Sequence, residues 1–527
     1  MTVIKTQAAK DGLRFDWYPI LQADFIDELA AEVMATIEAA RTSTRGSSPA
    51  AAEKRTQHQL IIAKHLLSAL YYAYSAVSIK KAPTRISVVK KTGGFSTDKT
   101  KYPTRIHYSF RYFIDVYKAL EQLKWISIDE GEQGVGYTRI HAKNRLKSTF
   151  KAIGLIWTKQ QPKSLEDLIV LRDRVEKTSK KPRHPKAPKK YKKVTLATPD
   201  TTEVTAMASS LYNYNEFLTK HCLALNVTDN ELYDIAKAIA GNRTSKQDDE
   251  EDIIANLDFS RVQLRRICSR GGLHKHGRFY NGWWQSVPSI YRQHITIDGY
   301  KTSEVDYSNM SLRVVYALQG IERDVDDDLY DIGLDNWLGD DDPRRKLIKV
   351  FVNALMNDET GNYKLKKTEL RTLGLTHEEL LALVLKTHEP IADQLTAGIG
   401  MKATYLDSQI AELVIKTMQT DDIVVLPIHD SFIVRTGYQR WLEVVMEAAF
   451  RAITGGIAST DADGPRLSKH FGLTKEQFKV EEQKLAIDPA EGIVAGSAID
   501  FETLFKETTM KKYLDYWELW RAKASNS

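Results

Sequence analysis

The sequence predicts an α+β protein of several domains. The chain has 527 residues and 42% hydrophobic content, which is too long for one compact core, so about two to four domains are expected. Helical and strand-like patterns alternate along it, with helices predicted over 205–270 around an acidic break at 248–252. Short strands and further helices follow to about 420, then a strand–turn–strand at 423–434 and a helix near 438–453.

Cysteine content and the first residues favour a cytoplasmic protein. The two cysteines, Cys222 and Cys268, exclude a disulfide framework and make a reducing compartment the expected one. Cys268 with His274 and His276 has C-x₅-H-x-H spacing, which lacks a fourth ligand and matches no common zinc module. The N-terminal residues lack the apolar core of a signal peptide, and no apolar run reaches the length of a membrane span. No membrane partner is expected.

Basic residues gather in the predicted linker, residues 179–200. The stretch KKPRHPKAPKKYKK at 180–193 holds eight Lys or Arg, three prolines and no acid. The proline spacing argues against a helix, and the repelling charges favour an extended segment. Two interpretations remain open, a solvated tether or an arm that contacts phosphates.

Residues 1–178, before this linker, are predicted to form a basic DNA-binding domain with a winged helix at 55–155. YSFRYFIDVYKALEQLKW, which begins at 108, has the period of an amphipathic helix. Two short strands, ISIDEG and GYTRIHA, follow around the loop EGEQGVG. A helix followed by a hairpin is the ending of a winged helix-turn-helix, and an ordinary α+β unit with a charged face is the alternative. The predicted apolar face is Phe110, Phe113, Tyr117, Leu120 and Leu123, and the candidate DNA contacts are Arg111, Tyr112, Lys118 and Gln122.

Two aspartates stand at the ends of apolar strands. Asp306 lies in SEVDYSNMSLRVVY (303–316), and Asp430 lies in the turn of VVLPIHDSFIV (424–434). An acid among apolar residues costs free energy unless a cation lies beside it. Each aspartate alone is most simply a turn or cap residue, so the chemical interpretation depends on what accompanies the pair.

A helix predicted at 341–357, DDPRRKLIKVFVNALMN, supplies cations. Arg345 and Lys349 are four residues apart and therefore project from one face. Two carboxylates can hold two divalent ions that stabilise the attacking and leaving oxygens of phosphoryl transfer. Mg²⁺ or Mn²⁺ needs few carboxylates when substrate phosphates complete its shell, and Arg and Lys neutralise the triphosphate. The combination predicts nucleotidyl transfer.

Five segments resemble the motifs of family-A nucleic-acid polymerases, which include DNA polymerase I and the phage-type single-subunit RNA polymerases. DYSNMSLR at 306–313 resembles the first palm motif, and IHDSF at 428–432 resembles the second. RRKLIKVFVNALMN at 344–357 is similar to the fingers helix. HGRFYNGWWQSVPSIYR at 276–292 and DSQIAELVIKTM at 407–418 resemble the segments that precede the two palm motifs, and all five stand in the order of the family.

This resemblance, over residues 276–434, implies a right-hand polymerase fold of thumb, palm and fingers behind the N-terminal domain. Thumb-like helices are expected at 201–275. The palm and fingers are expected at 276–527, with the fingers at about 322–400.

The resemblance also implies roles for individual residues. Asp306 and Asp430 would be catalytic and would bind two Mg²⁺ or Mn²⁺ ions, while Arg345 and Lys349 would meet the phosphates of the nucleotide. The rest of the nucleotide site would be Tyr307, through its backbone carbonyl, with Ser311, Asn353 and Asn357. Contacts with primer and template are implied for Arg278, Gln285, Arg313, His429 and Asp407.

Three features depart from the family pattern. Ser311 stands where the DNA enzymes have a glutamate that crowds the ribose 2′ position and the RNA enzymes have a glycine. Asn353 and Asn357 replace aromatic residues of the fingers helix, which removes a stacking surface for the incoming base. No D-x-E exonuclease motif stands out, so proofreading is not expected.

The sequence therefore predicts a DNA-directed DNA polymerase that acts on a primed template with nucleoside triphosphates and replicates a phage, plasmid or other mobile element. Its N-terminal part is expected to bind duplex DNA. A polymerase of the same superfamily that makes RNA or primers remains an alternative, because Ser311, the HDSF motif and the missing aromatic residues favour tolerance of ribonucleotides. A DNA-binding replication initiator without catalytic activity is the second alternative.

Overall fold

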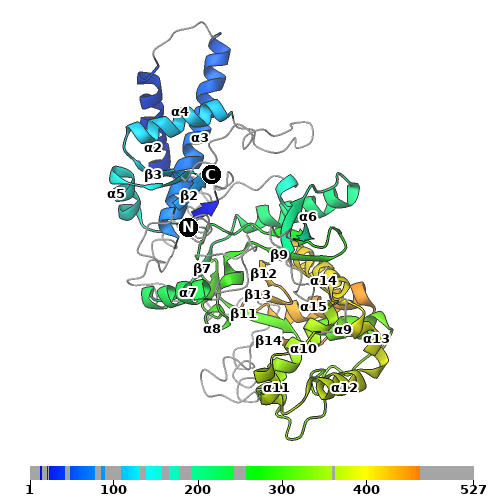
Figure 1. Ribbon diagram of the computed structural model, residues 1–527. Helices are drawn as coiled ribbons and strands as arrows, with labels where there is room; N and C mark the ends of the chain where they lie inside the picture. Colours follow the sequence, from blue (N-terminus) through cyan, green and yellow to red (C-terminus); the bar gives the residue numbers. More distant parts are fainter. Residues whose placement is uncertain are drawn as a thin grey trace, which may run out of the picture.

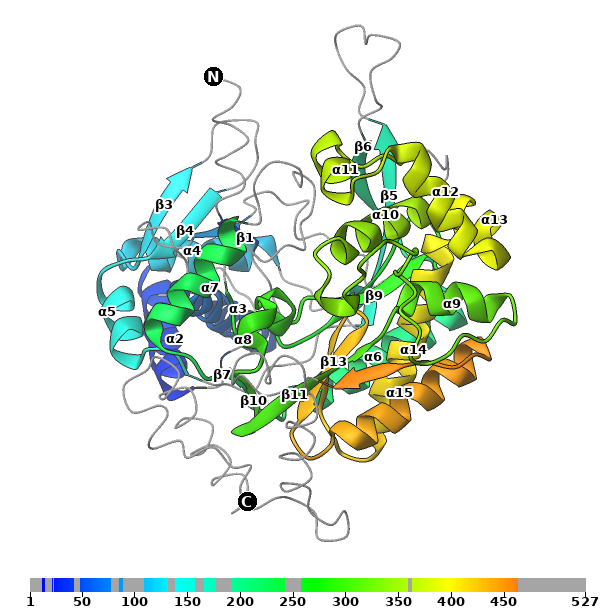
Figure 2. The ribbon, with the colours of Figure 1, turned by 90° about the horizontal axis from the view of Figure 1, so that it is seen from below.

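The described residues build two large hydrophobic cores and a small third cluster of Ile169, Met207 and Ala208. The computed structural model describes residues 12–14, 21, 23–41, 48–76, 85–88, 109–130, 138–156, 165–176, 191–241, 257–358 and 363–462. One core runs from Leu21 to Ile156, and the other runs from Leu155 to Ala458. Figures 1 and 2 show the helices of the first core as a lobe beside the second. The protein is thus a multidomain molecule of mixed helices and sheets, as the sequence predicts.

The N-terminal lobe combines a sheet with packed helices. The sheet has the order β1-β2-β4-β3 and consists of β1 (Gly12–Arg14), β2 (Arg85–Val88), β3 (Ile126–Glu130) and β4 (Thr138–Ala142). Its helices are α2 (Asp24–Ala39), α3 (Pro49–Ser75), α4 (Phe110–Gln122) and α5 (Asn144–Ile153). Helices α2, α3 and α4 pack against one another, and α3 also contacts β2 and β4.

Helix α4 and the hairpin β3–β4 agree with the expected local pattern. Phe113, Tyr117 and Leu120 are buried, and Phe110 and Leu123 are half-buried, because all five lie on the inner face of α4. Arg111, Lys118 and Gln122 are exposed, whereas Tyr112 is half-buried with its ring 6.0 Å from that of His58. The predicted wing, residues 131–137, lies outside the described residues. Strand β2 pairs with β4 and adds a third strand that the sequence pattern did not indicate.

The second core surrounds a sheet of order β12-β13-β11-β10-β7, with β14 paired to β11. Its strands are β7 (Leu223–Leu225), β10 (Ile295–Ile297), β11 (Tyr300–Tyr307), β12 (Val425–Ile428), β13 (Ser431–Arg435) and β14 (Thr460–Ala462). Helices α9 (Met310–Leu318), α14 (Gly400–Thr420) and α15 (Gln439–Thr454) pack together, and α14 and α15 also contact the sheet. The predicted strand–turn–strand at 423–434 is the hairpin β12–β13.

A further sheet corrects the predicted linker. Its order is β6-β5-β8-β9, made of β5 (Ile169–Glu176), β6 (Tyr191–Leu196), β8 (Arg265–Cys268) and β9 (His276–Tyr280). The basic stretch therefore ends in a paired strand instead of remaining a tether up to residue 200. Because β5 pairs with β8, the second core also begins before the predicted boundary at 178. Residues 177–190 lie outside the described residues.

The expected helical thumb is only partly helical. In the described part of 201–275, helices α6 (Thr202–Leu218) and α7 (Asp229–Gly241) are interrupted by β7, and β8 follows them. Helix α6 packs on α14 and β5, and the Tyr214 hydroxyl donates to the Val425 carbonyl of β12. Tertiary contacts with the two sheets thus override the helical pattern predicted for 205–270.

The predicted fingers, residues 322–400, contain a cluster of helices visible at the lower right of Figure 1. These are α10 (Arg345–Asn357), α11 (Lys367–Leu373), α12 (His377–Thr387) and α13 (Ala392–Thr396). Helix α12 begins with a capping box in which Thr376 and Glu379 satisfy each other's backbone N–H groups. The expected C-terminal part of the palm, from 463 to 527, lies outside the described residues.

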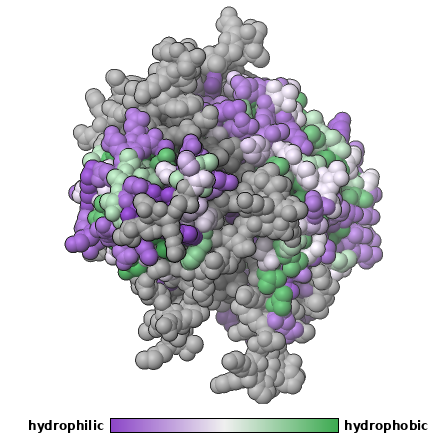
Figure 3. All heavy atoms as spheres, turned by 90° about the horizontal axis from the view of Figure 1, so that it is seen from above, coloured by the Kyte–Doolittle hydropathy of each residue, from purple (hydrophilic) through white to green (hydrophobic). Residues whose placement is uncertain are grey.

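No helix in the described ranges is long and apolar enough to cross a bilayer. On the face in Figure 3, apolar side chains are scattered among hydrophilic ones. Large exposed apolar residues such as Ile61, Ile290, Leu338 and Val444 lie in separate segments of the chain.

Candidate active site

Strand pairing brings the two predicted acids to one end of the central sheet. In the antiparallel pairing of β11 with β13, Asp306 lies opposite Ser431, the residue after Asp430. The Tyr307 N–H donates to the Asp430 carbonyl at 3.2 Å. Both aspartates are half-buried. Residues far apart in sequence thus meet as neighbours at a sheet end.

The local sequence explains this placement. Ile428 pairs with Ser431, so His429 and Asp430 form a two-residue hairpin turn, in which His429 adopts a left-handed φ of 59°. On the other strand, the Tyr307 side chain points into the core and its hydroxyl donates to the Met446 carbonyl of α15. The Tyr307 side chain is thus held in the core, and a role for its backbone carbonyl remains a prediction.

Arg278 of β9 lies beside these acids. Its Nε donates to Asp407 Oδ2 of α14 at 2.6 Å. The pKa of Asp407 is raised to about 6, mainly by burial and to a smaller extent by the charge of Asp430, while the charge of Arg278 lowers it. Burial opposes the charge of Arg278, yet Asp407 and Asp430 together hold its pKa above the ordinary value. The predicted primer-side residues Arg278, Asp407 and His429 thus surround the same sheet end.

His429 is a neutral side chain in this setting. Burial, assisted by Arg278, lowers its pKa to about 4. Its Nδ1 is buried and has no hydrogen-bond partner among the described residues. Its ring lies 5.5 Å from that of Tyr280, which stacks at 5.7 Å on His276. The sequence pattern did not indicate Tyr280 as a site residue, because a tyrosine in a short strand is as common in a core as in a binding site.

Helix α10 presents its cations to one aromatic ring. Arg345 and Lys349 lie 5.3 and 5.8 Å from the ring centre of Tyr330, which confirms that they share a face. Tyr330 is buried, its hydroxyl shares a hydrogen bond with Asn353, and it lies within electrostatic reach of Asp430. Tyr330 therefore contacts both cations of α10 and also responds to the charge of Asp430, which the sequence pattern did not reveal.

Arg345 already has an acidic partner. Its Nε and Nη2 each donate to one oxygen of Asp328 at 2.9 Å, and Asp340 lies 3.1 Å from Nη2. Burial disfavours the charge of Arg345, but Asp328 and Asp340 keep its pKa above the ordinary value. A phosphate at this guanidinium would have to replace or share these carboxylates.

The contacts of four other predicted residues are mostly with backbone. Gln285 donates to the carbonyls of Phe279 and Pro427. Arg313 is buried and donates to the carbonyls of Ser308, Asp324 and Val325. Both side chains therefore stabilise the neighbouring backbone. Asn357 is exposed and donates to the Asn353 carbonyl. Ser311, the second residue of α9, is half-buried. Substrate contacts of Gln285, Arg313 and Asn357 remain predictions, because here these side chains donate to backbone carbonyls.

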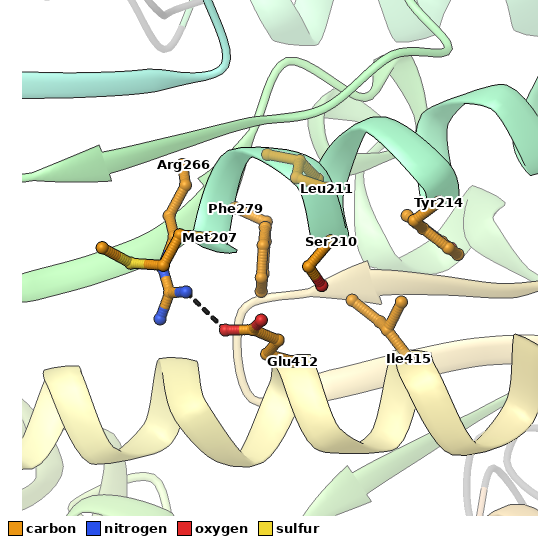
Figure 4. Close-up of a pocket in the computed structure, with 8 residues that line it drawn as sticks. All are labelled: Met207, Ser210, Leu211, Tyr214, Arg266, Phe279, Glu412 and Ile415. Carbon is orange, nitrogen blue, oxygen red and sulfur yellow. Dashed lines mark hydrogen bonds and ion pairs between the residues drawn. The ribbon is translucent and has the colours of Figure 1, made fainter. Parts of the chain in front are cut away.

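An ion pair between Arg266 of β8 and Glu412 of α14 lies close to the strand that carries Arg278. Figure 4 shows Arg266 meeting Glu412 between α6 and α14, in a pocket otherwise lined mainly by apolar side chains. The Arg266 guanidinium also donates to the Gly277 carbonyl and to the Ser408 hydroxyl. These contacts of Arg266 hold β9 against α14.

The zinc candidates are engaged in other contacts. Cys268 is buried, His274 Nε2 lies 2.7 Å from Glu203, and His276 Nε2 lies 2.7 Å from the Tyr280 hydroxyl. Among the described residues, no three His, Cys, Asp or Glu side chains are grouped as ligands of one metal.

Comparisons with known proteins leave the family open. No family model matches the sequence, and no curated protein matches it. Among solved structures, the chain is similar to the POL domain of Pol1 from M. smegmatis in complex with DNA primer-template and dNTP, with a TM-score of 0.28 and 11% identity. The similarity covers 44% of this chain and 50% of that chain. At this level it assigns the chain to no family.

Proposed function

We propose that this chain is a template-directed nucleotidyltransferase, a DNA polymerase without proofreading. The main support is the pairing of β11 with the β12–β13 hairpin, which makes Asp306 and Asp430 neighbours. The second support is Tyr330, which links Arg345 and Lys349 of α10 to the same region. Two acids beside a cationic helix are what metal-assisted transfer from a triphosphate requires.

The donor set suits Mg²⁺ or Mn²⁺. Asp306 and Asp430 offer hard carboxylate oxygens at a half-buried sheet end, and neighbouring His429 adds no charge because its pKa is lowered to about 4. Two carboxylates suffice when phosphates supply further oxygens. We propose that these aspartates hold two ions, which when bound stabilise the attacking and leaving oxygens.

The other residues bind and orient substrates in this proposal. Arg345 and Lys349 neutralise the triphosphate as pyrophosphate leaves. Arg278, oriented by Asp407, and the neutral imidazole of His429 contact the primer end. Ser311 is small and leaves room at the ribose 2′ position, so ribonucleotide incorporation remains the alternative within this proposal.

The N-terminal lobe would bind duplex DNA. Its support is the exposed face of α4, where Arg111 and Lys118 extend from a helix that is followed by the hairpin β3–β4. Lysine and arginine on such a face contribute mainly through phosphate contacts.

Primer extension tests the proposed activity. The full-length protein is incubated with a primed DNA template, Mg²⁺ or Mn²⁺, and either dNTPs or NTPs. We expect extension, and we expect Asp306→Asn and Asp430→Asn to reduce its rate by at least about a thousandfold, since loss of a metal ligand removes about 4 kcal/mol of transition-state stabilisation. DNA binding should stay nearly unchanged.

Asp393→Asn is the matched control, because Asp393 is an exposed aspartate of α13. It should extend primers like the native protein. Near-native extension by Asp306→Asn or Asp430→Asn would overturn the metal assignment. DNA binding by a native protein that extends with neither nucleotide type would favour a non-catalytic initiator.

A further inference from the structure

A third acid lies on the same strand as Asp306. Glu304 precedes it by two residues on β11, so the two side chains leave the same face of the strand. Glu304 is 5% exposed. A carboxylate so buried is tolerated only when it is paired.

Two donors converge on one oxygen of Glu304. Arg292 Nη1 lies 2.8 Å from Oε1, and the Ser431 hydroxyl lies 2.6 Å from the same atom. Arg292 is also anchored in its own segment, where its Nε donates to the Val287 carbonyl at 3.1 Å. The Glu304 charge is thus balanced locally and adds little repulsion to the two aspartates.

Ser431 connects Glu304 to the hairpin turn that bears Asp430. It is the first residue of β13, directly after Asp430, and it pairs with Asp306 across the strands. Its single hydroxyl proton has two acceptors within reach, Glu304 at 2.6 Å and the Ile428 carbonyl at 3.2 Å. The shorter contact to a charged acceptor is the stronger one. It ties the turn that bears Asp430 to the strand that bears Asp306.

We propose that Glu304 is a positioning residue for the divalent-cation site, acting through Ser431 to fix Asp430 relative to Asp306. The inference rests on the proposed function, because it assumes that the two aspartates share cations. Side chains that orient metal ligands without touching the metal commonly change metal affinity by about 10- to 100-fold when they are lost.

Ser431→Ala is the sharpest variant, because it removes the link and leaves the Glu304–Arg292 pair intact. Mn²⁺ binding to the full-length protein is measured by electron paramagnetic resonance, with Asp306→Asn as the baseline. We expect Ser431→Ala to raise the Mn²⁺ dissociation constant about tenfold, and Ser431→Thr, which retains the hydroxyl, to restore most of the affinity. Glu304→Gln should weaken binding too, and combining it with Ser431→Ala should give less than the sum of the two effects.

Ser68→Ala is the matched control. Ser68 is a buried serine of the N-terminal core that donates to the Lys64 carbonyl, so its loss should lower the unfolding temperature without changing Mn²⁺ affinity. Unchanged Mn²⁺ affinity in Ser431→Ala, or additive effects with Glu304→Gln, would overturn the positioning role while leaving the proposed function standing. Native Mn²⁺ binding no stronger than that of Asp306→Asn, together with no primer extension, would instead reject the proposed function itself.

Discussion

Replacing Asp407 with asparagine is expected to change how the free energy of unfolding depends on pH. Burial raises the pKa of Asp407 from 3.8 to about 6 even though Arg278 lies 2.6 Å away. The native state therefore binds this proton more tightly than the unfolded chain does. The proton's contribution to stability is complete below about pH 4 and is lost as the pH rises through about 6.

The size of the effect follows from the two pKa values. A difference of about two pKa units, at 1.36 kcal/mol per unit, corresponds to about 3 kcal/mol. An asparagine resembles the neutral acid and does not titrate. The difference in unfolding free energy, native protein minus Asp407→Asn, should therefore fall by about 3 kcal/mol between pH 3 and pH 7.

Urea denaturation at several pH values measures this difference. Tryptophan emission is a suitable signal, because Trp283 and Trp284 are fully buried in the core that includes the apolar residues of α14, the helix of Asp407. Comparing each variant with the native protein cancels contributions from the N-terminal lobe. Asp393→Asn, at an exposed position, should give a curve parallel to the native one. A parallel curve for Asp407→Asn would refute the reasoning, since it would mean that Asp407 titrates alike in both states.

Two further predictions concern the nucleotide and the DNA. Asp328→Asn should lower the KM for nucleotide about three- to tenfold, because it frees Arg345 from a half-buried bidentate contact worth about 1 kcal/mol. Steady-state kinetics of primer extension measure this KM, and an unchanged or higher value would contradict the prediction. Replacing Arg111 and Lys118 together with alanine should weaken duplex binding and reduce the slope of log affinity against log salt by about two. Fluorescence anisotropy over a range of salt checks this, and an unchanged slope would place the DNA contacts elsewhere.

The placement of Asp306 and Asp430 at strand ends was predictable from local patterns, whereas their meeting was implied only by the resemblance of the two segments to palm motifs. The shared face of Arg345 and Lys349 was predictable as well, since it depends only on helical spacing. Tyr330 and Asp328 were not, because they lie in an acidic segment without periodicity and reach α10 only through tertiary packing. The Glu304–Ser431 contact depends on the register of two strands distant in sequence, which no local pattern specifies.

The predicted linker shows how composition can mislead. Lysines and prolines over 179–200 indicate an extended tether, yet residues 191–196 pair with β5 as β6. This strand stands at the edge of its sheet, where lysine is common because it discourages pairing with other chains. Val194, Thr195 and Leu196 retain enough strand preference for pairing once β5 is available.

The glycine of the HGR segment has a packing role that is independent of any resemblance. Gly277 has a φ of +83°, and a Cβ there would lie 2.7 Å from the Ser408 hydroxyl oxygen. Its carbonyl accepts from Arg266, whose guanidinium also bonds Ser408 and meets Glu412 on α14. The close approach of β9 to α14 thus requires glycine at this point, and that approach places Arg278 against Asp407, one residue before Ser408. The glycine of the HGR segment is therefore also explained by packing, because it lets β9 bring Arg278 close to the sheet end that bears Asp306 and Asp430.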